Sequence, residues 1–308
     1  MSSQNCGQGT SCRRFHHLRC GSPVTTNGHH EPSGKLESAV GDRRMNFTRR
    51  QLSALLATSA ALQLVHRRAV AESAAAGDAE AAVDKLPDWS AVKLQLWKYT
   101  NPFVPSQWGE PKLGGYDWKA ANAKIVDGAL QLTVSEKASA QVVAGGKSDF
   151  SSARWEVDVT LPTMKPGLVA APLWTFNDKA HEEIDFEFVG TKGLQLNVWA
   201  NVDNQHKSVW LKWIQLGDLS GKRYRLGIEY EAGKRVAFLI DGKEAAVVTP
   251  ADTLGGAFPN KPMKAYFDLW VAAGAVMDAG WAGKWEPMPA SDKLVMTIHG
   301  YRRTDVDQ

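Results

Sequence analysis

Three acidic residues alternate with apolar ones in the stretch Glu-Ile-Asp-Phe-Glu near the middle of the chain. Successive side chains of a β-strand point to opposite faces, so Glu183, Asp185 and Glu187 would share one face. Ile184 and Phe186 would share the other, apolar face. Like charges placed side by side repel one another and cost stability. The pattern therefore indicates that the three carboxyl groups are retained for their chemistry.

Two carboxyl groups that flank a glycosidic bond are what glycoside hydrolysis requires. Crowding favours this role, because neighbouring negative charges raise one pKa and leave that group protonated as a donor. The Cα atoms of Glu183 and Glu187 would lie roughly 13 Å apart on an extended strand. A retaining mechanism needs carboxyl groups about 5 Å apart. The hypothesis therefore requires a bent strand, on which Asp185 would hydrogen-bond one glutamate.

Two other interpretations fit the same alternation. An edge strand with a solvated face also alternates acidic and apolar residues, although such faces usually mix in Lys, Thr and Ser. A Ca²⁺ site is the second, because hard cations prefer oxygen ligands. The motif alone leaves both open.

Short alternating segments separated by turn residues follow from about residue 89 onward. Expected strands include 129–134, 154–161, 224–230, 235–240, 244–248 and 294–299. Asp241-Gly242 between two of them is a hairpin signal. Many short strands at regular spacing predict an all-β, two-sheet β-sandwich.

Composition divides the chain into a leader and one large domain. All twelve tryptophans lie between Trp89 and Trp285, and all three cysteines precede Met45. We expect a catalytic domain at 87–304, preceded by an Ala-rich linker at 72–86. Residues 1–44 are rich in Arg, Ser, Gly and His and are expected to be a disordered leader or a mis-assigned start before Met45.

Residues 45–71 have the features of a bacterial twin-arginine export signal. Arg49-Arg50 precedes an apolar run, and Ala69-Val70-Ala71 offers a cleavage site before Glu72. An amphipathic helix is the alternative. The run is too short for a stable membrane span. We therefore expect a periplasmic or secreted bacterial protein.

Charge argues against a nucleic-acid partner once the leader is set aside. From Glu72 onward the chain carries 26 Lys and Arg against 30 Asp and Glu, a net charge of −4. The same part contains no cysteine, so no disulfide is expected there. We expect a monomer that acts on a polysaccharide.

The sequence Glu183-Ile-Asp-Phe-Glu-Phe-Val-Gly190 resembles the active-site strand of family 16 glycoside hydrolases. It is most similar to the bacterial lichenase and plant xyloglucan-modifying branches. Further similar segments flank it in the same order: 118–122, 127–132, 166–176, 196–201, 267–270 and 280–285. The resemblance covers roughly residues 95–303 and implies a concanavalin-like jelly roll with a concave substrate cleft.

The resemblance also implies roles for the acidic residues. Glu183 matches the nucleophile, Glu187 the general acid/base and Asp185 the assisting carboxylate of a retaining mechanism. The implied activity is endo-cleavage of a β-1,3-1,4-glucan or a related β-linked exopolysaccharide. His181 and Glu182 stand where many lichenases carry Trp and Asp, and the lichenase cysteine pair is absent, so the exact glucan stays open.

Aromatic residues near the motif are candidates for stacking on sugar rings. By resemblance Trp199 and Trp270 lie in the cleft, with Asn197 and Asn201 as partners for hydroxyl groups. Trp174 and His181 are further substrate-binding candidates. Each tryptophan could equally belong to the core, because large aromatic rings dominate buried area. His206 and His299 are expected to be ordinary polar residues.

No cofactor is expected to be required, although the resemblance allows a structural Ca²⁺ with Asp292 as a candidate ligand. Three rival functions remain. They are a non-catalytic carbohydrate-binding sandwich, a transglycosylase of the same fold and a Ca²⁺-dependent adhesion module.

Overall fold

The computed structural model describes residues 86–96, 102–274 and 279–306. The chain divides into two units, Met1–Glu80 and Ala81–Gln308, and every described residue belongs to the second. The predicted leader, the export signal and all but the last residue of the linker lie outside the described residues. Their boundaries stay predictions.

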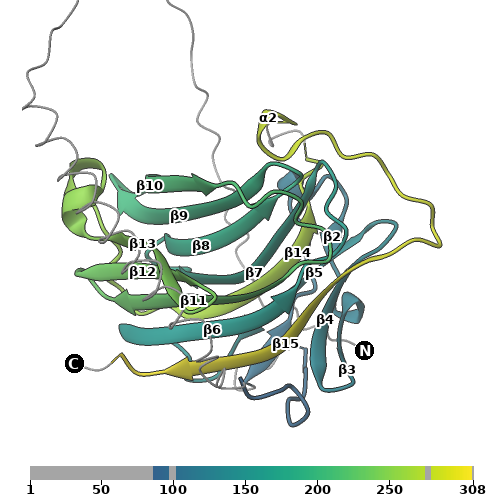
Figure 1. Ribbon diagram of the computed structural model, residues 1–308, viewed down its shortest axis with the longest axis horizontal. Helices are drawn as coiled ribbons and strands as arrows, with labels where there is room; N and C mark the ends of the chain where they lie inside the picture. The colour runs from purple at the N-terminus through teal and green to yellow at the C-terminus, as the bar shows by residue number, and fades with distance from the viewer. Residues whose placement is uncertain (1–85, 97–101, 275–278, 307–308) are drawn as a thin grey trace, which may run out of the picture. The chain divides into compact units, whose positions relative to one another are not determined.

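Two sheets make up the described part of the chain (Figure 1). The first contains, in spatial order, β1 (Phe103–Pro105), β5 (Ala138–Ala144), β14 (Lys264–Val271), β7 (Leu168–Asn177), β8 (Glu182–Val189), β9 (Gly193–Val202) and β10 (Gln205–Ile214), with β2 (Asp117–Trp118) beside β5. The second contains β13 (Lys243–Val248), β12 (Arg235–Ile240), β11 (Arg223–Glu231), β6 (Ser152–Thr160), β15 (Leu294–Thr304), β4 (Ala129–Val134) and β3 (Ala123–Val126).

Neighbouring strands in these orders pair antiparallel, and only β2 pairs parallel with β5. The long strands are visibly bent in Figure 1. The helical segments of the described residues are short: the 3-10 turns Pro111–Leu113, Ala120–Asn122, Pro250–Asp252 and Leu254–Gly256, and α2 (Ala279–Ala282). The predicted two-sheet β-sandwich is confirmed.

The core lies between the sheets and follows the alternation of the sequence. On β6 Trp155, Val157 and Val159 are fully buried, and on β8 Ile184 and Phe186 are fully buried. Burying a side chain of this size contributes roughly 1.5–3 kcal/mol. The face of β8 that bears Ile184 and Phe186 therefore packs on the core, so Glu183, Asp185 and Glu187 lie on the opposite face.

The turn between β12 and β13 forms as its sequence predicts. Asp241 and Gly242 both adopt positive φ angles, 50° and 75°. Two consecutive left-handed residues define the type I′ turn that suits a two-residue hairpin.

The outer face of the second sheet carries a buried carboxylate surrounded by arginines. Glu156 on β6 is 2 % exposed. Its Oε1 accepts hydrogen bonds from Arg154 Nη2 at 3.1 Å and Arg225 Nη2 at 3.0 Å, and its Oε2 accepts one from Arg302 Nε at 2.7 Å. These partners come from β6, β11 and β15, so the cluster ties three strands together.

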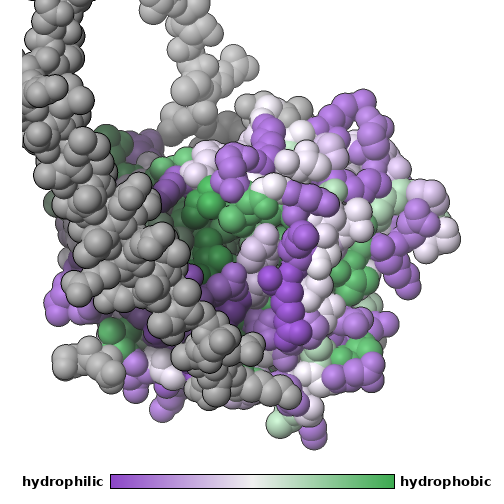
Figure 2. All heavy atoms as spheres, viewed as in Figure 1, coloured by the Kyte–Doolittle hydropathy of each residue, from purple (hydrophilic) through white to green (hydrophobic). Residues whose placement is uncertain are grey.

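The surface is mixed in character. Figure 2 shows hydrophilic and hydrophobic residues interspersed, with hydrophobic ones gathered in a hollow near the centre of the view. None of the helices in the described part of the chain has the length and apolar character needed to span a membrane.

Candidate active site

The three acidic residues of the motif lie on one face of β8, at the middle of the first sheet. Glu183 stands opposite Trp199 of β9, Asp185 opposite Asn197 and Glu187 opposite Gln195. We call the side of this sheet that faces away from the core, and bears these carboxyl groups, the acidic face. The structure therefore brings together the three residues that the alternation predicted to share a face.

Burial decides the protonation of these groups. It is the largest influence on each of them and raises the pKa of Glu183, Asp185 and Glu187 above the ordinary carboxyl range. The charge of Glu183 raises the pKa of Glu187 further, whereas the Lys112 ammonium lowers the pKa of both glutamates. A side-chain hydrogen bond to Asp185 also lowers that of Glu183. The arrangement favours the proton on Glu187 and the charge on Glu183.

Trp199 connects the middle carboxyl to the neighbouring strand. Its indole Nε1–H donates to Oδ2 of Asp185 at 2.8 Å. The ring is half-buried and stacks on the imidazole of His206, with centroids 4.6 Å apart. His206 Nε2 in turn lies 3.4 Å from Glu183 Oε2.

His206 is a site residue that the sequence reasoning missed. It lies just after the turn at Asp203 and Asn204, whose positive φ angles of 54° and 60° reverse the chain between β9 and β10. This hairpin pairs His206 with Asn201 and so brings its ring beside Trp199. The register of the hairpin is the signal that would have found it.

Asn197 and Asn201 lie on the acidic side of β9, but both amides are engaged. Asn197 is 1 % exposed, and its Oδ1 accepts a hydrogen bond from Ser208 Oγ at 2.7 Å. Asn201 Nδ2 donates to the carbonyl of Ala180 at 2.9 Å. Contact between these amides and sugar hydroxyls stays a prediction.

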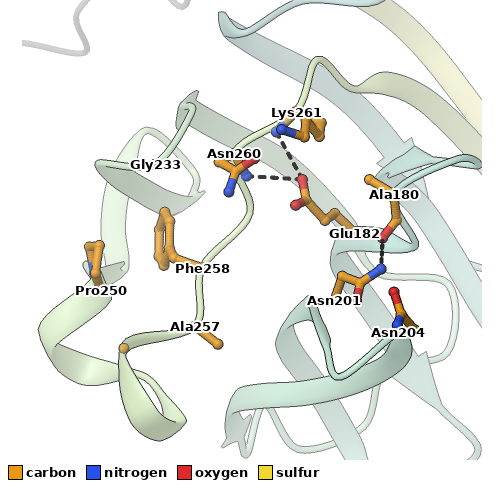
Figure 3. A pocket seen from close by; sticks show the side chains of 11 residues that line it. Ala180, Glu182, Asn201, Asn204, Gly233, Pro250, Ala257, Phe258, Asn260 and Lys261 are labelled. Carbon is orange, nitrogen blue, oxygen red and sulfur yellow. Dashed lines mark hydrogen bonds between the residues drawn. The ribbon is translucent and has the colours of Figure 1, made fainter.

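The pocket drawn in Figure 3 has a volume of about 670 Å³. Asn201 and Glu182 line it, and Glu183, Asp185 and Glu187 do not. The Glu182 carboxylate points toward the loop opposite and accepts the backbone N–H groups of Asn260 and Lys261, each at 2.9 Å. Glu182 therefore holds the loop that contains Asn260 and Lys261 in place, and it does not belong to the acidic face.

Trp174 and Trp270 occupy different surroundings. Trp174 is half-buried, pairs with Asp185 across β7 and β8, and lies 4.3 Å from the Tyr266 ring. Trp270 is 5 % exposed and packs against Trp118 and Trp281. Its ring is held among other aromatic residues, and stacking on a sugar stays a prediction for both tryptophans.

A loop residue brings positive charge to this end of the sheet. Lys112 Nζ lies 5.4 Å from the centroid of the Trp270 ring and 3.1 Å from Glu110 Oε1.

His181 lies in the turn before β8 with a φ of 54°, is half-buried, and donates its backbone N–H to the carbonyl of Asn177 at 2.9 Å. Contact between His181 and substrate stays a prediction.

Asp268 on β14 is another buried carboxyl, and the sequence reasoning did not single it out. It is 5 % exposed, and its Oδ2 accepts a hydrogen bond from Gln141 Nε2 at 3.0 Å. Gln141 Oε1 accepts a second from Ser106 Oγ. Burial raises the pKa of Asp268 to about 8. An acid within the apolar strand sequence Phe-Asp-Leu-Trp was the available signal.

Asp292 lies in an exposed turn, where its Oδ1 accepts a hydrogen bond from Ser291 Oγ at 3.1 Å. Across residues 86–96, 102–274 and 279–306, no group of three or more His, Cys, Asp or Glu side chains could hold a metal ion. A structural Ca²⁺ at Asp292 gains no support from its neighbours.

Fold and site together define a class: a two-sheet β-sandwich whose central strand carries three crowded carboxyl groups on its outer face. A family model described as "Glycosyl hydrolases family 16" matches residues 114–286, more than half of the chain. The chain therefore belongs to glycosyl hydrolase family 16.

Curated relatives are plant proteins. The chain is 28 % identical over 165 residues to xyloglucan endotransglucosylase/hydrolase 2 of Glycine max, covering 50 % of this chain and 56 % of that protein. It is 25 % identical over 162 residues to xyloglucan endotransglucosylase protein 1 of Diospyros kaki, covering 50 % and 55 %. The chain thus spans about half of the length of these relatives.

Solved structures support the same fold at lower identity. A prokaryotic β-1,3-1,4-glucanase (lichenase) from a mouse hindgut metagenome superposes with a TM-score of 0.52 at 18 % identity, covering 66 % of this chain and 93 % of that one. The Bacillus licheniformis β-glucanase gives 0.50 at 16 % identity, covering 61 % and 84 %. The jelly-roll fold of the family and its similarity to lichenase-type structures are confirmed.

Proposed function

We propose that this chain is a retaining, endo-acting glycoside hydrolase that cleaves a β-linked glucan, either a β-1,3-1,4-glucan or a related exopolysaccharide. One observation carries the proposal. Glu183, Asp185 and Glu187 share one face of β8, and burial raises the pKa of all three. A fold whose only need was stability would not keep three acids in such surroundings, because each one pays for desolvation and mutual repulsion.

The reaction follows from the protonation order of the two glutamates. In the first step a Glu183 carboxylate oxygen bonds to the anomeric carbon while the bond from that carbon to the bridging oxygen breaks. Glu187 transfers its proton to the departing oxygen, which leaves as a hydroxyl group. In the second step Glu187 removes a proton from water, and the hydroxide displaces Glu183 from the anomeric carbon. Both residues return to their starting states.

Asp185 has a supporting role in this scheme. It lies between the two glutamates and is held by the Trp199 indole. Its hydrogen bond to Glu183 lowers the pKa of that residue and so favours the ionised nucleophile.

A panel of polysaccharides tests the proposal. Lichenan, laminarin, xyloglucan, agarose and a bacterial exopolysaccharide would be incubated with the chain, and reducing ends and product sizes would be measured. Endo-cleavage of a β-glucan with retention of anomeric configuration, read by proton NMR, is the expected result. Glu183→Gln is the matched control and should lose nearly all turnover while keeping its Tm. Sugar binding without cleavage in the panel would instead favour a carbohydrate-binding module.

A second candidate function is transglycosylation through the same intermediate, with a sugar hydroxyl replacing water. It is favoured by the curated relatives, which are named as xyloglucan endotransglucosylases. Products longer than the starting oligosaccharide, formed at high acceptor concentration, would establish this activity. Products that are only shorter would exclude it for the acceptors used.

Export and calcium binding are proposals of the same kind. The paired arginines and the cleavage site predict that the chain crosses a bacterial inner membrane, which cell fractionation tests through the position of the processed N-terminus. A structural Ca²⁺ predicts a Tm that falls on addition of chelator. The same titration separates the hydrolase from a Ca²⁺-dependent adhesion module, whose ligand binding would be lost.

A further inference from the structure

We propose that His206 is a positioning residue for the nucleophile: its neutral imidazole donates Nε2–H to Oε2 of Glu183 and leaves the second carboxylate oxygen to face the substrate. This inference rests on the proposed function, because positioning matters only if Glu183 reacts. It goes further by placing on β10 a group that acts on the central residue of β8.

The geometry around His206 fixes its ring. One face stacks on the Trp199 indole at 4.6 Å with an interplanar angle of 26°. The Phe176 ring meets it edge-on at 5.9 Å and 65°. Two aromatic neighbours from β9 and β7 therefore restrain the plane of the imidazole, whose Nε2 lies 3.4 Å from Glu183 Oε2.

The surroundings also set the charge of the ring. The His206 side chain is 32 % exposed, and the partial desolvation of its ring lowers the pKa to about 4, with further lowering by the charges of His181 and Lys112. Glu183 on β8 is the acidic group that faces it. With this pKa His206 is neutral where the enzyme would work, so its 3.4 Å approach to Glu183 Oε2 is not an ion pair.

A neutral donor suits a nucleophile better than a cation. A hydrogen bond to a carboxylate favours the ionised form, which the first step requires. A cation at the same place would form an ion pair with the Glu183 carboxylate and so weaken its attack. At 3.4 Å the approach is longer than an ordinary N–H···O hydrogen bond, and catalytic contacts often tighten when substrate binds.

The contacts form a chain on the acidic face. Asp185 accepts a hydrogen bond from Trp199, Trp199 stacks on His206, and His206 Nε2 lies 3.4 Å from Glu183 Oε2. Each member restrains the next. A nucleophile held in this way loses little freedom on reaching the transition state.

Two substitutions separate donation from packing. His206→Phe keeps a flat ring against Trp199 but removes the donor. His206→Gln carries an amide N–H to the position of Nε2 but gives up the ring. For His206→Phe we expect kcat to fall roughly 10- to 100-fold with little change in KM, and the acidic limb of the kcat/KM profile to move to higher pH. His206→Gln should recover most of the lost kcat.

A second readout does not depend on turnover. Carbon-13 NMR titration of the Glu183 carboxyl should show a higher pKa in His206→Phe than in the wild type or His206→Gln. The control is His299→Gln on β15, whose Nε2 lies 2.8 Å from Thr160 Oγ1 in the second sheet. This variant should leave kcat and the Glu183 titration unchanged.

The outcomes distinguish this inference from the proposed function. If the wild type cleaves no glycan, the proposed function fails, whereas the NMR titration still tests the contact. If the wild type is active and His206→Phe keeps its kcat, acidic limb and Glu183 titration, the positioning role is refuted. Equal loss of kcat in the Phe and Gln variants would also refute it, since only one of them lacks the donor.

Discussion

The indole Nε1–H of Trp199 donates a 2.8 Å hydrogen bond to Oδ2 of Asp185, across the β8–β9 register that pairs Asp185 with Asn197 and Glu183 with Trp199 itself. Asp185 is 1 % exposed. A carboxyl group buried to this degree needs a partner, because an unpaired one bears a large desolvation penalty. Trp199 supplies that partner and lowers the pKa of Asp185, which burial otherwise raises.

Replacing Trp199 with Phe tests this contact. The variant keeps an aromatic ring but loses the N–H donor and part of the ring area, and the control below has the same loss of area. We expect kcat to fall roughly 10-fold, the effect of a lost hydrogen bond to a buried carboxyl group. The matched control is Trp210→Phe on β10, whose ring stacks on Phe238 of the other sheet at 5.8 Å. The control should lower the Tm and leave kcat of the folded protein unchanged. Full activity in Trp199→Phe would show that Asp185 does not depend on the indole.

The acid role of Glu187 predicts a dependence on the leaving group. Glu187→Gln cannot protonate the bridging oxygen, so cleavage of natural glucan should fall by about 10²- to 10⁴-fold. Aryl glycosides with acidic leaving groups need little protonation and should be spared by comparison. Steady-state rates on both substrate types provide the measurement. An equal loss on the two would assign Glu187 to another task.

The buried acids predict a pH-dependent stability. Burial raises the pKa of Glu187 in the folded protein above its unfolded value. Protonated Glu187 therefore contributes to the free energy of unfolding, and this contribution is lost as the pH rises through the folded pKa. Glu187→Gln stays neutral at all pH values. It should match the wild type near pH 4 and exceed its free energy of unfolding at pH 9 by on the order of 1 kcal/mol, or a Tm higher by about 3 °C.

Thermal unfolding of both proteins between pH 4 and pH 9 checks this expectation. The exposed Glu286, which pairs with Lys284, supplies the control Glu286→Gln, whose difference from wild type should be small throughout the range. A Glu187→Gln protein less stable than wild type at pH 9 would contradict the protonation order assigned to the site.

The arginine cluster around Glu156 predicts a stability effect without a catalytic one. Its pKa is lowered, because hydrogen bonds and charge from Arg302 and Arg154 outweigh the opposing effect of burial. Glu156→Gln leaves three guanidinium groups without their shared anion. We expect the free energy of unfolding to fall by roughly 2–4 kcal/mol at pH 7, with kcat per folded molecule unchanged.

The lowered pKa of Glu156 also predicts how the stability difference between wild type and Glu156→Gln depends on pH. A depressed folded pKa contributes stability above the unfolded pKa and loses it as the pH falls, so the gap between wild type and Glu156→Gln should narrow toward pH 3. Asp158→Asn is the matched control on the same strand. Its partner Arg223 is 59 % exposed, and the loss should stay below about 1 kcal/mol. Equal losses of unfolding free energy in the two variants would mean that the buried arginine cluster stabilises the fold no more than an exposed ion pair does.

Alternation in the sequence was sufficient for the parts of the fold that have one buried face. The strand expected at 154–161 forms β6 and buries Trp155, Val157 and Val159, and Glu183, Asp185 and Glu187 share one face of β8 as the alternation predicted. These predictions hold because a slip of one residue would expose the whole apolar set. Local turn chemistry at Asp241-Gly242 was equally informative.

Contacts between strands were beyond such reasoning. His206 meets Glu183 only because the β9–β10 hairpin and the β8–β9 register combine. Gln141 donates a hydrogen bond to Asp268 although the two residues are 127 positions apart in the sequence. The sequence did not indicate which neighbours an outward-facing aromatic residue has. Trp270, for example, packs against Trp118 and Trp281, and its expected contact with substrate stays a prediction.

The central claim is that Glu183 forms a covalent bond to the sugar, and trapping that intermediate tests it most directly. A 2-deoxy-2-fluoro glucoside or cello-oligosaccharide with a good leaving group would slow both steps and let the glycosyl-enzyme accumulate. Peptide mass mapping should then find one added glycosyl group on Glu183, and none in Glu183→Gln. Attachment to Asp185, to Glu187 or to a residue outside β8 would contradict the account.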